Sequence, residues 1–224
     1  MKLLLERKEV NPDSSDEEGQ TPLFAAAQGG HEGIVKLLLE RKEVNPGPFD
    51  VYGKSPLFGA ARGGHEGIVK LLLERKEVNP HSSDKSRQTP LIEVVRLGHE
   101  GIVNLLLQRK EVNLGSSGEG GRMPLGEAAS CGHEGIVKTL LECKEVDPDS
   151  SNEYGQTPLS GAAQGGHESI VKLLLQRKEV NPNSSDEYGK TPLFGAAWGG
   201  HDSIVKLLLA LLKVCSRRQV LVTE

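Results

Sequence analysis

The chain has 224 residues and carries 27 Lys and Arg against 31 Asp and Glu, a formal net charge of -4. It lacks the basic excess with which proteins neutralise phosphates, so nucleic acid is not an expected partner. Its three cysteines stand at unrelated positions, which fits neither a disulfide framework nor a metal site.

Neither end of the chain carries a membrane signal. Residues 1–10 lack the apolar core of a signal peptide. The longest apolar stretch, Leu207 to Leu212, has six residues, whereas about 18 are needed to cross a bilayer. We expect no membrane association and a cytoplasmic location, with the nucleus as the alternative.

A Pro-Leu pair preceded by Thr, Ser or Met recurs six times, always 34 residues apart. The residues before the pair are Thr21, Ser55, Thr89, Met123, Thr157 and Thr191. A fixed period of this size predicts stacked repeats, each a small unit that contacts only its neighbours. We expect an amino-terminal half repeat with the first loop over residues 1–20, six repeats forming a single domain over 21–212, and a carboxy-terminal tail or cap over 213–224.

Each repeat is predicted to hold two short helices and a polar loop. In the first repeat, a Thr-Pro step begins a helix over residues 21–30 and Gly-Gly ends it, because the hydroxyl caps free amides and Pro costs nothing at the first helical position. His31 begins a second helix with an apolar face, on whose wet side Glu32 and Lys36 form an ion pair. The loop over 42–54, here called a finger, ends in Asp-Val-Tyr-Gly, which favours a type I turn.

Two repeats depart from this pattern. In the fourth, Met123 replaces the capping Thr and Gly118 replaces the turn Asp, so we expect this repeat to be the weakest in the stack. In the sixth, apolar residues replace the Glu-Arg-Lys after the second helix, so that helix is expected to run on. We expect the tail over 213–224 to fold back as a cap, or the same surface to form a homo-oligomer.

The order Thr-Pro-Leu, Ala-Ala, Gly-His, Ile-Val, Leu-Leu-Leu, Val-Asn and Asp-x-x-Gly resembles the ankyrin repeat, over about residues 1–209. Two family positions differ: the usual His after Thr-Pro-Leu is Phe24 in the first repeat, and the usual Gly after the second helix is Lys42. The resemblance implies an all-α ankyrin-repeat solenoid of six helix-turn-helix units with projecting finger loops, which acts as a protein-protein interaction module.

The near-identical units also resemble the arrays of large fungal NACHT-type signalling proteins. This likeness implies that the chain is a recognition arm or scaffold of such a protein. Because it starts in mid-repeat, we expect it to be a fragment of the larger protein.

Positions that differ between repeats are candidates for recognition, because identical positions maintain the stack. The resemblance places two of them on a concave binding face: the third residue of the finger turn and the residue after Ala-Ala. The residue before Thr-Pro-Leu lies between these two. All three tyrosines occupy the first position and the single tryptophan the second, and such residues are enriched in interfaces. The candidate partner-binding residues are Tyr52, Arg62, Arg96, Tyr154, Gln164, Tyr188, Lys190 and Trp198.

Three other patterns favour structure over chemistry. The His that recurs in every repeat stands once per layer, so we expect structural hydrogen bonds rather than a metal site. Gly53-Lys54-Ser55 imitates the end of a phosphate-binding loop, but five residues separate it from Gly47 where four are required. The Arg-Lys-Glu run after the second helix is a docking strip or, the favoured interpretation, a solvated edge of mixed charge.

The sequence therefore predicts a non-enzymatic chain with no catalytic residue, cofactor or metal. Its expected partner is another protein, which the sequence does not identify. The rival hypothesis is a structural spacer whose surface binds no specific partner.

Overall fold

A computed structural model describes residues 11–115 and 118–220, with the backbone alone for residues 212–220. Within these ranges the chain holds twelve α-helices, one short 3-10 helix and no strand, which confirms the predicted all-α fold. The chain divides into two compact units, Met1–Asn113 and Leu114–Glu224. The elements of the first unit are α2 (Pro22–Gln28), α3 (Glu32–Leu39), α4 (Pro56–Arg62), α5 (Glu66–Leu73), α6 (Pro90–Leu97) and α7 (Glu100–Leu107). Those of the second are η1 (Glu119–Gly121), α8 (Pro124–Cys131), α9 (Glu134–Glu142), α10 (Pro158–Gly165), α11 (Glu168–Leu175), α12 (Pro192–Trp198) and α13 (Asp202–Val220).

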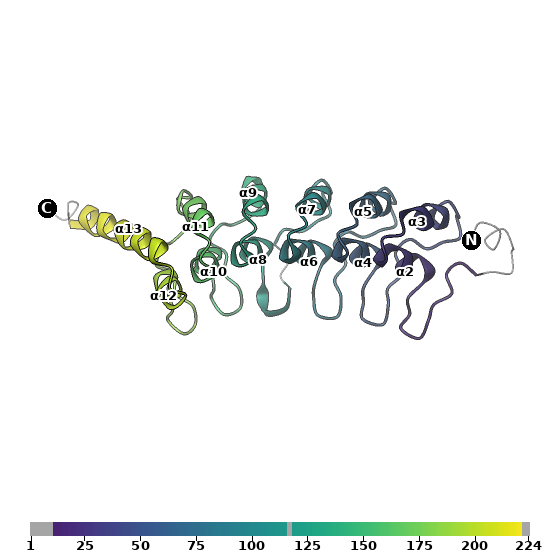
Figure 1. Cartoon of the computed structure of the whole chain (residues 1–224), viewed down its shortest axis with the longest axis horizontal. Coiled ribbons are helices and arrows are strands. Elements are labelled where there is room, and N and C mark those ends of the chain that lie inside the picture. The colour runs from purple at the N-terminus through teal and green to yellow at the C-terminus, as the bar shows by residue number, and fades with distance from the viewer. Residues whose placement is uncertain (1–10, 116–117, 221–224) are drawn as a thin grey trace. The chain divides into compact units, whose positions relative to one another are not determined.

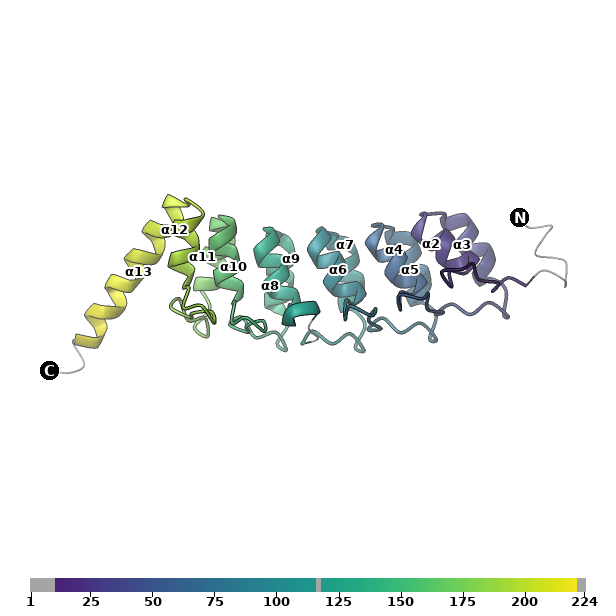
Figure 2. The same cartoon turned by 90° about the horizontal axis from the view of Figure 1, so that it is seen from below.

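Each unit consists of two layers of helices (Figure 1). In the first unit, the first helices of the repeats, α2, α4 and α6, pack side by side, and the second helices, α3, α5 and α7, form the other layer. In the second unit, α8, α10 and α12 form one layer and α9, α11 and α13 the other. The fingers project beside the first helices (Figure 2). The predicted helix-turn-helix repeats are therefore present in both units.

Apolar side chains at equivalent positions of the repeats form the core. Leu23, Leu57 and Leu91 of the first helices and Val35 and Val69 of the second are almost fully buried. A helix of seven residues such as α2 is marginal on its own in water. Because each buried side chain of this size contributes ~1.5–3 kcal/mol, packing against neighbours rather than helix propensity stabilises the pairs.

The Thr-Pro step begins the first helices as predicted. The Thr21 hydroxyl accepts a hydrogen bond from the Phe24 amide at 3.3 Å, and Pro22 stands at the start of α2. The equivalent residues that cap their helices in the same way are Ser55, Thr89, Thr157 and Thr191. Met123 makes no such bond with its side chain.

The finger turns have the predicted Asp and Gly geometry. In the second finger, the Gly53 amide donates to the Asp50 carbonyl at 3.0 Å. The Asp50 carboxylate accepts from the amides of Tyr52 and Lys54 at 2.9 and 2.8 Å. Gly53 has φ +81°, and a Cβ on it would lie 3.2 Å from the backbone nitrogen of Lys85. Glycine is needed there both for the left-handed backbone and for the approach of the next finger.

Neighbouring fingers are joined through the main chain at the tyrosine position. The Lys85 amide donates to the Tyr52 carbonyl at 2.9 Å in the first unit, and the Glu187 amide donates to the Tyr154 carbonyl at 3.0 Å in the second. The backbone that carries these tyrosines is therefore held in place.

The recurring histidines form structural hydrogen bonds, as predicted. Nε2 of His65 lies 3.1 Å from the carbonyl oxygen of Gln28, and Nε2 of His201 lies 3.0 Å from that of Gln164. Since a carbonyl only accepts, Nε2 carries the proton in both. Each bond joins the last or next-to-last residue of one first helix to the following repeat, and His99 and His167 make the same link.

The arginine of the Arg-Lys-Glu run caps the neighbouring repeat. Arg75 donates to the carbonyl of Leu39 at 2.6 Å, and Arg109 donates to the carbonyl of Leu73. Both carbonyls stand at the ends of second helices, α3 and α5, where backbone acceptors lack partners within the helix. Arginine thus satisfies a helix-end acceptor of the neighbouring repeat, a contact that neither the docking strip nor the solvated edge predicts.

The last helix runs on as predicted, since α13 extends from Asp202 to Val220. The predicted cap over 213–224 would be formed by side chains that lie outside the described part of the chain. Residues 1–10 of the predicted half repeat also lie outside it. The cap and a homo-oligomer through this end therefore stay predictions.

The boundary between the two units falls within the finger over 110–122, which precedes Met123. The first unit ends at Asn113, the second begins at Leu114, and the turn of this finger contains the 3-10 helix η1. Met123 has φ -91° and ψ 150°, close to the values of Thr89, which does cap its helix. The backbone is therefore ready for a capping side chain that this repeat does not supply.

We predict that Met123→Thr stabilises the fourth repeat by ~1 kcal/mol, because the hydroxyl would satisfy a free amide of α8. Hydrogen exchange should show slower opening of amides between 118 and 130 in the variant. Thr157→Met is the matched control and should weaken the fifth repeat to a similar extent. Equal exchange rates in the variant and the wild type would contradict the role given to the missing cap.

Candidate functional site

The surface formed in each unit by the first helices and the finger turns is here called the finger face (Figure 2). Two positions are exposed on it in the described repeats: the last residue of the first helix or its equivalent, and the third residue of the finger turn, except that Gly120 at the latter position is half-buried. These are the variable positions that the sequence points to. At several of these positions, such as Tyr52, Tyr154 and Gln164, the side chain is exposed while the carbonyl of the same residue is bonded to the next repeat.

In the first unit, a lysine lies over two aromatic rings. Lys54 Nζ lies 5.7 Å from the centre of the Tyr52 ring and 5.6 Å from that of Phe58. Tyr52 is about half exposed, whereas Phe58 is buried, so only the tyrosine offers contact area to a partner. Lys54, the lysine of the segment 53–55 that resembles a phosphate-binding loop, thus makes cation–π contacts within the protein.

The predicted binding residues Arg62 and Arg96 both pair with a buried carboxylate. Glu93, only 5% exposed, lies with Oε1 3.4 Å from Arg62 Nε and 3.0 Å from an Arg96 guanidinium nitrogen. Arg96 Nε donates to the other oxygen at 3.3 Å. Both guanidinium groups are half exposed and therefore accessible to a partner. They also neutralise the negative charge of Glu93, whose burial would otherwise be unfavourable.

We predict that Arg62→Gln and Arg96→Gln each lower the free energy of unfolding by less than ~1 kcal/mol, since Glu93 keeps one guanidinium. The double variant should lose ~1–3 kcal/mol more than the sum, because the buried carboxylate is left without a cation. Urea unfolding followed by circular dichroism measures both.

Glu93→Gly added to the double variant introduces the residue that the preceding repeat has at this position, Gly59. It should restore most of the lost free energy of unfolding, because no buried carboxylate then remains. Additive effects of the two arginine substitutions would show that the pair does not act together on Glu93.

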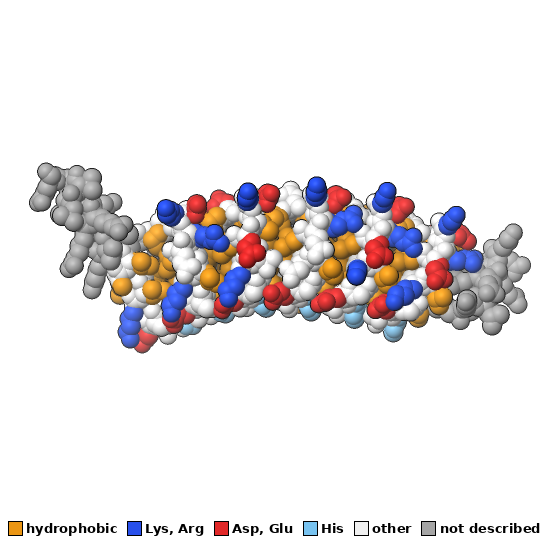
Figure 3. Space-filling model, turned by 90° about the horizontal axis from the view of Figure 1, so that it is seen from above, with side chains coloured by type: hydrophobic (Ala, Val, Ile, Leu, Met, Phe, Trp, Pro, Cys, Tyr) orange, Lys and Arg blue, Asp and Glu red, His pale blue; other side chains and the backbone are white. Residues whose placement is uncertain are grey.

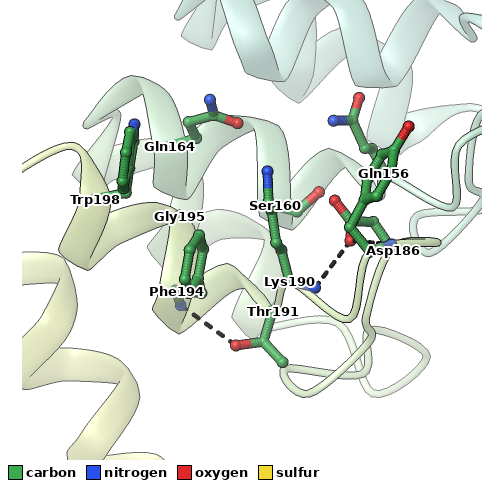
Figure 4. A pocket seen from close by; sticks show the side chains of 10 residues that line it. Gln156, Ser160, Gln164, Asp186, Lys190, Thr191, Phe194, Gly195 and Trp198 are labelled. Carbon is green, nitrogen blue, oxygen red and sulfur yellow. Dashed lines mark hydrogen bonds between the residues drawn. The ribbon is translucent and has the colours of Figure 1, made fainter.

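In the second unit, four of the predicted residues line one pocket. Gln164, Tyr188, Lys190 and Trp198 surround a volume of about 270 Å³ between the fifth and sixth repeats. Figure 4 shows Gln164 and Ser160 on α10, Trp198 and Phe194 on α12, and Lys190 with Asp186 on the sixth finger. The remaining lining residues are Gln156, Thr191 and Gly195. The elements of two repeats thus converge on one hollow of the finger face.

The pocket combines aromatic rings with one cation. Lys190 Nζ lies 5.5 Å from the centre of the Tyr188 ring and 5.9 Å from that of Phe194. The rings of Phe194 and Trp198 are nearly parallel, at 11°, with centres 6.3 Å apart. The Glu187 carboxylate accepts a hydrogen bond from the Tyr188 hydroxyl and thereby raises the pKa of Tyr188 above its ordinary value. The hydroxyl is therefore protonated at neutral pH.

Phe194 differs from its equivalents in the first unit. Phe24 and Phe58 are 2% and 3% exposed, whereas Phe194 is 47% exposed. The sequence therefore did not distinguish it, because the same residue type at the same position is a core residue in two other repeats. Glu93 was missed as well, although it stands where the second, fifth and sixth repeats have Gly, a contrast that is visible in the sequence.

Tyr154 is the remaining predicted residue and does not line the pocket. It stands half exposed on the fifth finger, and its carbonyl is bonded to the sixth finger. Arg122, in the fourth repeat, pairs with the nearly buried Glu127 at 3.3 Å, much as Arg62 pairs with Glu93. The predicted set therefore falls into a first-unit group and a second-unit group.

The face over the second helices carries charges of both signs, interspersed with apolar atoms (Figure 3). Several of these charges pair within a helix: Lys36 with Glu32 at 2.6 Å, Lys138 with Glu134 at 2.5 Å, and Lys172 with Glu168. The first of these is the ion pair that the spacing predicts.

The described residues contain no group of three or more His, Cys, Asp or Glu placed to hold a metal ion. In the same part of the chain, no helix combines the length and apolar character that a membrane crossing requires.

The repeated pattern of capped helix pairs and fingers agrees with a family model. The model for ankyrin repeats, which spans three copies, matches residues 1–84, 68–152 and 136–217. The chain belongs to the ankyrin repeat family. Ankyrin repeats are generally protein-interaction modules and generally not enzymes. Comparison with curated proteins gave no match.

Within this ankyrin-repeat chain, the variable positions at the end of the first helix carry exposed side chains of the finger face, as do most of those in the finger turn, whereas the variable Glu93 is buried. The positions that recur, such as the capping Thr and the bridging His, make the bonds within and between repeats.

Proposed function

We propose that this ankyrin-repeat chain binds a protein partner on its finger face and catalyses no reaction. The observation that carries the proposal is the pocket of the second unit, where Tyr188, Lys190 and Trp198 converge with large exposed areas. Trp198 is 80% exposed and Tyr188 is 72% exposed. Exposed aromatic side chains that gather in a hollow are typical of the residues that dominate binding energy.

The chain acts in this proposal as the recognition arm or scaffold of a larger signalling protein. Its resemblance to the arrays of fungal NACHT-type proteins supports this role. The first-unit residues Tyr52, Arg62 and Arg96 would add contacts to the same kind of partner, with the arginines keeping their bonds to Glu93.

The spacer hypothesis makes a different demand on the surface. A spacer needs repeats that stack, and this need is met by the buried residues and the capping bonds alone. The spacer hypothesis does not explain why Trp198 of α12 and Tyr188 of the sixth finger are both exposed and line the same pocket. Exposed aromatic side chains lower the solubility of a protein. Their concentration in one pocket therefore favours the hypothesis that the pocket binds a partner.

We predict that a double variant, Tyr188→Ala with Trp198→Ala, weakens partner binding about tenfold or more, since each hot-spot residue contributes ~2 kcal/mol. The partner would first be captured from an extract of the source organism with the wild-type chain and then titrated against both forms by calorimetry. Circular dichroism should be unchanged, because both side chains are exposed.

Lys172→Ala on the second-helix face is the matched control and should leave the affinity unchanged. A captured protein that binds the double variant as tightly as the wild type would contradict this site. If no protein is retained by the wild-type chain over a bead control, the spacer hypothesis would be favoured instead.

A further inference from the structure

The pocket between the fifth and sixth repeats has a chemical character that narrows the kind of partner. We propose that it binds an extended peptide segment in which an acidic side chain stands next to an apolar one. The carboxylate would pair with Lys190, and the apolar side chain would lie on the rings of Phe194 and Trp198. This inference rests on the proposed function, because it names the partner segment that the same site would hold.

The ammonium of Lys190 is the part of the pocket that can attract an anion. Lys190 is the single cation among the residues that line it. Among the described residues, no carboxylate lies within ion-pair distance of Lys190. The carboxylate of Asp186 lines the pocket but already accepts from the amides of Tyr188 and Lys190, at 3.0 and 2.8 Å. The ammonium is therefore available for a carboxylate from outside.

The rings beside the lysine supply the apolar part of the site. The rings of Phe194 and Trp198 on α12 stack nearly parallel to each other and are 47% and 80% exposed; this pair of rings is here called the platform (Figure 4). An aliphatic or aromatic side chain on this platform removes apolar area from water on both partners, and such burial is favourable in proportion to area. Gln156 and Gln164 line the same hollow with amide groups that can bond a peptide backbone.

A basic segment fits the pocket poorly, although aromatic rings often receive cations. The position between the rings of Tyr188 and Phe194 is already taken by the ammonium of Lys190, at 5.5 and 5.9 Å from the ring centres. A second cation would meet this charge at close range, and like charges brought together at an interface disfavour binding. The pocket therefore discriminates by charge between acidic and basic segments.

The first unit offers a natural comparison. Lys54 lies over Tyr52 and Phe58 with nearly the same distances as Lys190 in the second unit. However, Phe58 is buried, and the residue equivalent to Trp198 is Arg62, which is paired with Glu93. The second repeat has the lysine without the platform, so we expect it not to bind the same segment.

The chain carries its own reporter for this site, because Trp198 is its only tryptophan. The probe is a short capped peptide that alternates leucine and aspartate, titrated into the full chain while Trp198 emission is recorded. Burial of the exposed indole by leucine should shift the emission to shorter wavelength in a saturable way. Added salt should weaken the binding, since part of it is a partly exposed charge pair.

Three matched peptides separate the two parts of the site. Asparagine in place of aspartate should weaken binding about tenfold, by removing the charge that pairs with Lys190. Alanine in place of leucine should abolish the emission shift. Lysine in place of aspartate should not bind.

The corresponding variants of the chain test the same contacts from the other side. Lys190→Gln should reduce affinity for the aspartate peptide about tenfold and leave the affinity for the asparagine peptide unchanged. Lys190→Arg should retain binding, because the charge is kept. Lys54→Gln, the matched change in the second repeat, should have no effect on the titration.

Equal affinity for the aspartate, asparagine and lysine peptides would overturn the proposal, as would binding that is unaffected by Lys190→Gln. A saturable shift that is absent for all peptides up to about 1 mM would overturn it as well. These failures leave the proposed function standing if a captured protein still depends on Tyr188 and Trp198. If both the capture and the peptide titration fail, the pocket itself has no binding role.

Discussion

No helix pair of this chain can bury its apolar face without a neighbour, and the structure of each unit follows from this constraint. The first helices are seven or eight residues long, and their core residues such as Leu57 reach full burial only because a helix of the next repeat covers them. Stability in such arrays is a sum of repeat and neighbour contributions.

The same constraint separates the positions that hold the repeats together from those that are free to differ. The bridging histidines bind the carbonyls of Gln28 and Gln164, which are the very residues whose side chains form the exposed column of the first helices. The finger bonds do the same for Tyr52 and Tyr154. The candidate residues Tyr52, Tyr154 and Gln164 therefore stand on a backbone fixed by the next repeat, which would reduce the entropy that binding must overcome.

Most of the fold could be predicted from the sequence, because the period, the capping Thr and the turn Asp act locally and recur. The positions of the exposed columns followed from the same register. What the sequence did not reveal depends on packing between repeats: the burial of Glu93 between two arginines, the exposure of Phe194, and the use of Arg75 as a cap for the preceding helix. The tail over 213–224 could be predicted only as alternatives, since it does not follow the repeat.

We propose that the finger face, rather than the second-helix face, holds the partner. Oxidative footprinting of the full chain, alone and with a captured partner, tests it most directly, because Tyr188, Trp198 and Leu209 are all exposed and reactive in the free chain. The account predicts that Tyr188 and Trp198 become protected while Leu209 and the residues of α9 and α11 keep their reactivity. Protection of α9 and α11 with unchanged oxidation of Trp198 would contradict it.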